Sequence, residues 1–177
     1  NQSRRQRQMC IRDRFFVGDH RRASLALDHL RKAEDGLSPL ASLQVNNIIL
    51  CEEVKGFGNY TAFPSSTLNA GQATIVYCEI ENYKTSKTVS SRGFGPQFES
   101  EFQSSISIVN EDRQVVRQFT YQPIIDKARR RRRDFYIHYT LTIPDDLPKG
   151  NYTLSLQVED VKAGKTTQSP PVAFRVR

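Results

Sequence analysis

Apolar and polar residues alternate with a period of two through most of this chain, and no other feature restricts its fold as strongly. Leu154, Leu156 and Val158 fall on one side of such a segment, and polar residues separate them. Residues 135–143 alternate equally cleanly. This pattern is typical of strands with one face in a core and the other in water, which favours antiparallel sheets.

Weaker alternation predicts further strands along the chain. They cover residues 43–51, 76–80, 102–108, 115–121 and 172–176. Turn-forming residues such as 69–71 and 148–150 separate the strands, with no helical pattern between them. We therefore predict a mainly β fold, an immunoglobulin-like antiparallel β-sandwich of about seven strands. The chain has no Trp, so the prediction concerns the broad sandwich class rather than antibody domains.

Residues 19–36 show a different period. Ala23, Leu27 and Leu30 recur at three- and four-residue spacing, which predicts one short N-terminal amphipathic α-helix. Asp19 is suited to cap its start, and Gly36 is suited to its end. This helix either binds a partner or packs against the strands that follow it, and we favour packing.

The first residues do not resemble natural protein sequence. Arg4 to Arg14 reads Arg-Arg-Gln-Arg-Gln-Met-Cys-Ile-Arg-Asp-Arg, and it matches the translation of a transposase tagging adapter used in sequencing libraries. We expect residues 1–14 to be an adapter artefact without ordered structure, and the native polypeptide to begin near Phe15. Removing their five Arg and one Asp reduces 26 basic and 19 acidic residues to 21 and 18, a net charge of +3 instead of +7.

Three segments follow from these observations: the artefact at 1–14, a helix and linker at 15–40, and the β-sandwich at 41–177. Most of the excess basic charge lies in the artefact, which weakens a nucleic-acid hypothesis. No apolar run approaches the roughly 20 residues that span a bilayer. We expect the fragment to belong to a longer chain.

Two cysteines lie in the predicted sandwich. Cys78 shares a face with Val76 and Ile80, so its side chain is expected in the core. A disulfide between Cys51 and Cys78 would close a loop and stabilise the fold by about 3 kcal/mol. The alternative is a pair of buried free thiols, because cysteine is often buried unpaired. Their spacing does not indicate a zinc site.

Five consecutive arginines precede one predicted strand. Arg129, Arg130, Arg131, Arg132 and Arg133 are a candidate patch for a polyanion or another partner. The alternative is a solvated loop whose guanidinium groups pair with nearby carboxylates, and we favour it. Arg133 and Asp134 are the adjacent pair most suited to a structural role, because they lie where the next predicted strand begins.

Two Gly-Phe-Gly triplets place Phe57 and Phe94 in glycine-flanked turns, and Tyr60 lies near the first. Glycines permit tight turns that can present a ring outward, where it stacks on a sugar or contacts a peptide. Alternatively these rings close the open ends of the sandwich, which we favour. Phe57, Tyr60 and Phe94 are therefore the aromatic candidates for ligand binding.

Catalysis and cofactors receive little support from the sequence. His20, His29 and His138 lack metal-ligand spacing, and we predict no metal, no cofactor and no catalytic residue. Phosphate-binding, nucleophile-elbow and zinc-hydrolase motifs are missing. We therefore predict that the protein is not an enzyme.

Several short sequence segments together resemble a known group of proteins. They include residues 51–58, 68–72, 77–83, 132–136, 147–154 and 158–160. The set is similar to a group of uncharacterised bacterial proteins, typical of planctomycetes, with a C-terminal immunoglobulin-like β-sandwich. The similarity covers roughly residues 43–176. It implies an accessory or assembly module of a larger envelope-associated protein, and it transfers no catalytic residue.

The resulting hypothesis is a non-enzymatic interaction or structural module, with an unknown protein or an upstream domain of the same polypeptide as its partner. A carbohydrate-binding accessory domain of an enzyme is the alternative, with a glycan as ligand. A third hypothesis is weak polyanion binding through Arg129–Arg133, which would fall steeply with salt.

Overall fold

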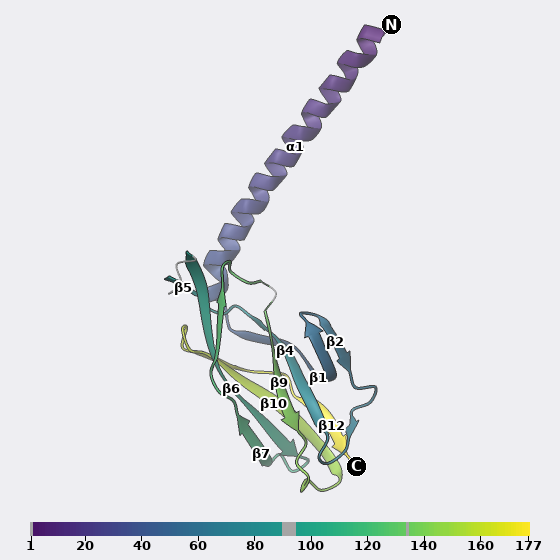
Figure 1. Cartoon of the computed structure of the whole chain (residues 1–177), viewed down its shortest axis with the longest axis vertical. Helices are drawn as coiled ribbons and strands as arrows, with labels where there is room; N and C mark the ends of the chain where they lie inside the picture. The colour runs from purple at the N-terminus through teal and green to yellow at the C-terminus, as the bar shows by residue number, and fades with distance from the viewer. Residues whose placement is uncertain (1, 90–94, 134) are drawn as a thin grey trace. The chain divides into compact units, whose positions relative to one another are not determined.

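The computed structural model describes residues 2–89, 95–133 and 135–177, with side chains described from residue 19 onward. The chain forms two compact units, Asn1–Leu40 and Ala41–Arg177. The first is helical and the second contains all the strands of the described residues (Figure 1). Mainly β structure with one α-helix therefore agrees with the predicted fold class.

Helix α1 spans Gln2–Leu37 and is followed by the 3-10 turn η1, Ser38–Leu40. It begins well before the predicted start at Asp19, and it includes positions 2–14, for which we expected no order. Arg, Gln and Met are good helix formers, and no Gly or Pro occurs in positions 2–17 to interrupt a helix. All side chains of residues 19–37 are exposed. The packing of this helix on the strands stays a prediction.

One sheet, here sheet A, contains four strands in the order β2-β1-β4-β9, and each neighbouring pair is antiparallel. Its strands are β1 (Gln44–Gly56), β2 (Asn59–Ala62), β4 (Ala73–Glu81) and β9 (Tyr136–Thr142). Strands β1 and β4 lie in the middle, and β2 and β9 form the two edges.

The other sheet, sheet B, contains eight strands, and five of them follow the order β3-β12-β10-β6-β5. These are β3 (Thr67–Leu68), β12 (Val172–Val176), β10 (Gly150–Asp160), β6 (Pro96–Asn110) and β5 (Ser86–Val89). Strand β11 (Lys165–Gln168) pairs with β10, while β7 (Val115–Thr120) and β8 (Ile124–Ala128) pair with β6. The pair β3 and β12 is parallel, and the other pairs are antiparallel.

The described residues thus form twelve strands in two sheets, more than the seven predicted. A strand occurs at each of the seven predicted places. The additional strands β2, β3, β5, β8 and β11 are two to five residues long. They escaped prediction because they are short and show no alternation of apolar and polar residues in the sequence.

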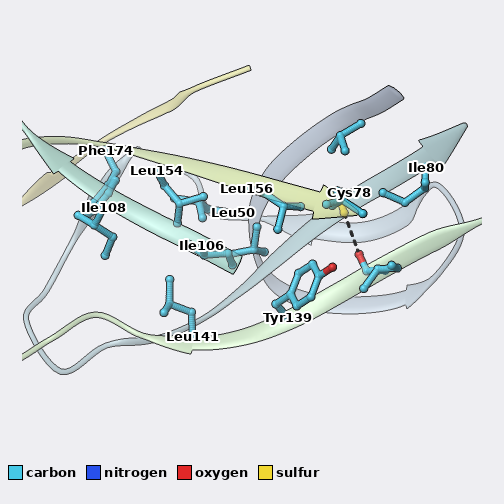
Figure 2. Packing of buried hydrophobic residues seen from close by; sticks show 14 of the residues in the cluster. Leu50, Cys78, Ile80, Ile106, Ile108, Tyr139, Leu141, Leu154, Leu156 and Phe174 are labelled. Atoms are coloured by element: carbon cyan, nitrogen blue, oxygen red, sulfur yellow. Dashed lines mark hydrogen bonds between the residues drawn. The ribbon is translucent and has the colours of Figure 1, made fainter. Parts of the chain in front are cut away.

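The two sheets contribute to one hydrophobic core. Fully buried side chains of sheet A, such as Cys78 and Ile80, meet those of sheet B, such as Ile106, Leu154 and Leu156 (Figure 2). Burying a side chain of this size stabilises the folded state by about 1.5–3 kcal/mol. In β10, residues Thr153, Ser155 and Gln157 occupy the positions between the buried ones, which explains the period-two pattern of that segment.

The two cysteines of the β unit are buried free thiols. Cys78 faces the core, and its Sγ lies 3.6 Å from the carbonyl oxygen of Ile137 (Figure 2). Leu50 pairs in register with Val76 and shares its face, so the next residue, Cys51, lies on the opposite face of sheet A. The disulfide considered from the sequence is therefore not formed.

Within the described residues, no helix combines the length and apolar character needed to cross a membrane.

Candidate functional site

Four rings form a row on the face of sheet A that points away from the core. The centroids of Tyr60 and Tyr77 are 4.8 Å apart, those of Tyr77 and Tyr136 are 5.5 Å apart, and those of Tyr136 and His138 are 6.2 Å apart. These residues come from β2, β4 and β9. They share a face because residues in antiparallel register point the same way, and Tyr77 pairs with His138.

Tyr77 is the buried centre of this row. Its hydroxyl accepts a 2.8 Å hydrogen bond from the Gly58 amide and donates a 2.9 Å bond to Glu79 Oε1. Burial, together with the nearby Glu79 carboxylate, raises the pKa of Tyr77 to about 12. Gly58 has a φ of 63°, a left-handed conformation that favours glycine. The turn between β1 and β2 is thereby fixed to the aromatic row.

A cleft of about 250 Å³ lies where this row reaches the edge strand β9. It is lined by Asp126, Arg132, Phe135, Tyr136, Ile137 and His138. Nε of Arg132 lies 3.1 Å from Oδ2 of Asp126. An ion pair between Asp126 of β8 and Arg132 of the β8–β9 connection therefore lines the cleft together with residues 135–138, three of which belong to β9.

Two hydrogen bonds hold the arginine-rich connection in place. The Tyr83 hydroxyl donates to the Arg132 carbonyl oxygen at 3.0 Å, and Arg131 Nε donates to Thr85 Oγ1 at 3.1 Å. Burial raises the pKa of Tyr83 to about 12, so this hydroxyl stays protonated and can donate at neutral pH. The backbone of the connection is thus tied to the segment that follows β4.

The structure distributes the predicted binding residues unevenly. Tyr60 belongs to the aromatic row, and Arg132 lines the cleft. Phe57 is 45% exposed, so it does not close an end of the core as we had favoured. Phe94 and Asp134 lie outside the described residues.

The remaining predicted arginines are not among the residues that line the cleft. Arg129, Arg130 and Arg133 are exposed, and Arg131 is half-buried against Thr85. The choice between a polyanion patch and a structurally paired loop stays a prediction.

Sequence reasoning missed Tyr77, Tyr136, His138 and Asp126. Alternation in β9 did place Tyr136 and His138 on the outer side of their strand. The sequence does not reveal which strand lies next to β9. The register of β4 with β9 brings together residues about 60 positions apart, and no local pattern predicts it. An outward aromatic residue in each of two predicted strands was the available signal.

A second cleft, of about 350 Å³, lies on the outer face of sheet B. Its side chains include Thr67, Asn110, Glu111, Asn151, Thr153 and Arg175. Two of them already pair, since Asn151 Nδ2 donates to Glu111 Oε1 at 2.6 Å. None of the predicted binding residues lines this cleft. Substitutions in it can therefore act as controls for substitutions in the cleft beside β9.

Over the parts of the chain that the structure describes, no group of three or more His, Cys, Asp or Glu is arranged to hold a metal ion.

No family model and no curated protein matches this chain. Among solved structures, it is similar to the Pseudomonas fluorescens alkylpurine DNA glycosylase AlkC bound to DNA containing an abasic site analog, with 10% identity and a TM-score of 0.43. That match covers 77% of this chain and 31% of the glycosylase, so this chain spans about a third of that protein. A second match is the C-terminal domain of wzt, with 15% identity, a TM-score of 0.45, and coverage of 77% and 74%. Neither likeness supports an argument about function.

Proposed function

We propose that residues 41–177 are an immunoglobulin-like β-sandwich that acts as a non-enzymatic interaction module. The sandwich class is supported by two mostly antiparallel sheets with one shared core. The resemblance of residues 43–176 to planctomycete proteins supports a place in a larger, envelope-associated bacterial polypeptide.

The observation that carries the interaction role is the convergence of three features at one edge of sheet A. The aromatic row ends at the cleft, the cleft lies along β9, and the arginine-rich connection forms its other wall. Partly exposed rings beside arginine are the residue types that contribute most to binding energy in protein interfaces. A folded scaffold that places them together is suited to recognising another molecule.

Carbohydrate binding is the second candidate for the same surface. The half-buried rings of Tyr60 and Tyr136 offer apolar contact, and the charged groups of Asp126 and Arg132 can hydrogen-bond hydroxyl groups. The same arrangement would therefore suit a sugar with one apolar face.

Screening the full chain against a random peptide display library and a glycan array tests the interaction role. We expect at least one ligand class whose binding is lost in the double variant Tyr136→Ala and Arg132→Ala. The control is Asn151→Ala with Arg175→Ala, which alters the cleft on sheet B. Ligands lost equally in both variants, or no ligand for a folded protein in either format, would contradict the proposal.

A further inference from the structure

Strand β9 uses only half of its backbone hydrogen-bonding groups to pair with β4. The carbonyl oxygen of Phe135 accepts a 3.1 Å bond from the Ile80 amide, and Cys78 pairs in register with Ile137. In an antiparallel pair, backbone groups point alternately toward and away from the partner. The N–H and C=O groups of Tyr136, His138 and Thr140 therefore point away from β4.

No strand pairs with that outer side of β9 in the described part of the chain. One of its groups has a partner, because the Tyr121 hydroxyl donates to the Thr140 carbonyl oxygen at 3.3 Å. This contact limits the open segment to Tyr136 and His138. The cleft runs along these same residues, so the open backbone faces a hollow rather than a packed surface.

The sequence of β9 lacks the usual protection of an edge strand. It reads Tyr-Ile-His-Tyr-Thr-Leu-Thr, with no Pro, Gly or Lys, and its pairing with β4 contains no bulge. Natural edge strands commonly avoid adding another strand by means of such residues or bulges. Aromatic and β-branched residues also favour extended pairing.

The charge beside this edge selects among extended partners. Residues 126–134 contain six basic and two acidic residues, a net charge of +4. Arg132 is held at the cleft by its contact with Asp126 and by the bond from Tyr83 to its carbonyl oxygen. A segment entering the cleft from this side would meet the Arg132 guanidinium, within a stretch of net positive charge, which favours carboxylates at that end.

We propose that β9 accepts an extended peptide segment of a partner protein as a fifth strand of sheet A, with acidic residues of that segment lying against the arginine-rich connection 129–133. This inference rests on the proposed interaction role and names its partner class. Main-chain hydrogen bonds to Tyr136 and His138 supply the pairing, and the arginines supply the preference for acidic sequence.

The test measures binding of a fluorescent synthetic peptide to the full chain by fluorescence anisotropy. The peptide alternates Val and Thr over the length of β9 and carries an Asp-Glu repeat at one end. Two N-methylated isomers are compared with it, one methylated at the odd and the other at the even strand positions. Only one isomer keeps the N–H groups that face β9, so we expect one to bind as before and the other to lose at least tenfold in affinity.

Variants of the protein test the same contacts. Proline at position 138 removes an N–H that points away from β4, so His138→Pro should weaken peptide binding at least tenfold without breaking the β4 pairing. The matched variant His138→Thr also loses the imidazole but keeps the N–H, so the proline variant should bind at least tenfold more weakly than the threonine variant. The charge preference is tested with Arg130→Gln and Arg132→Gln, which should lower affinity for the acidic peptide severalfold.

Equal binding of both methylated isomers would overturn strand addition, and so would equal binding of the acidic tail alone, which would indicate a polyanion site. A peptide ending in Lys-Arg that binds as well as the acidic one would overturn the charge preference. If a folded full chain binds no such peptide but binds glycans through Tyr136 and Arg132, this inference fails while the interaction role stands.

Discussion

Cys51 and Cys78 lie on opposite faces of sheet A, although each is completely buried. Cys78 faces the core shared by the two sheets, while Cys51 lies on the face that carries Tyr77. Burial raises the pKa of the Cys78 thiol to about 12 and also raises the pKa of Cys51 above its ordinary value. Both residues are therefore protonated and shielded at neutral pH.

This placement predicts two unreactive thiols in the native protein. In a Cys10→Ser variant, we expect a colorimetric thiol reagent to label neither remaining cysteine at neutral pH within minutes. Both should react after denaturation in guanidinium without any reductant, because no disulfide has to be broken. A mass two hydrogens lower before reduction than after it would show that a disulfide exists.

A second prediction concerns the hydrogen bond between the two sheets. The Tyr139 hydroxyl donates to Ser104 Oγ at 2.7 Å inside the core. Tyr139→Phe should destabilise the fold by about 1–3 kcal/mol, because the Ser104 hydroxyl loses its buried partner. The double variant Tyr139→Phe with Ser104→Ala should cost less than the sum of the single variants. Urea unfolding of all four proteins measures this coupling, and strictly additive effects would show that the bond contributes nothing.

Stability should decrease in alkali. The pKa values of Tyr77, Tyr83 and Cys78 are each raised to about 12 in the folded chain, from ordinary values of 10.0 for Tyr and 9.0 for Cys. Because the unfolded chain loses these protons first, their contribution is complete below pH 9 and is lost as the pH rises through about 12. Thermal unfolding across that range should show this decrease, and Tyr83→Phe should make it shallower. A melting temperature that stays constant across the range would contradict the burial of these groups.

The side chain of Phe57 is exposed to solvent and is not part of the hydrophobic core. Its ring is 45% exposed, so Phe57→Ala should change the free energy of unfolding by no more than about 0.5 kcal/mol. The matched core variant Leu156→Ala, at a fully buried position, should cost about 2–5 kcal/mol. Chemical denaturation compares the two directly. A loss of several kcal/mol for Phe57→Ala would show that this ring does close the end of the core.

Much of the fold was predictable because alternation in sequence reports burial on one face of a strand. Clean alternation in β9 and β10 placed Tyr139 and Leu154 inside correctly. Alternation also placed Cys78 in the core. It could not assign Cys51, which lies near the end of its predicted segment and requires the register with β4.

The candidate site was less predictable because it depends on contacts between distant segments. A Gly-Phe-Gly triplet and a run of arginines identified Tyr60 and Arg132, but Tyr136 became relevant only through its place on the edge strand β9. The cleft is lined by Asp126 of β8, Arg132 of the following connection and residues of β9, and no local pattern encodes that meeting. The short strand β8 itself lacks the alternation that would have revealed it.

Amide hydrogen exchange followed by NMR measures whether the outer edge of β9 is open. In the free protein, we expect fast exchange at Tyr136 and His138 and slow exchange at Ile137 and Tyr139, whose amides point toward β4. Adding the acidic peptide should slow exchange at Tyr136 and His138 alone. Equal protection of all four amides in the free protein would show that the edge is already occupied and that no further strand can pair with it.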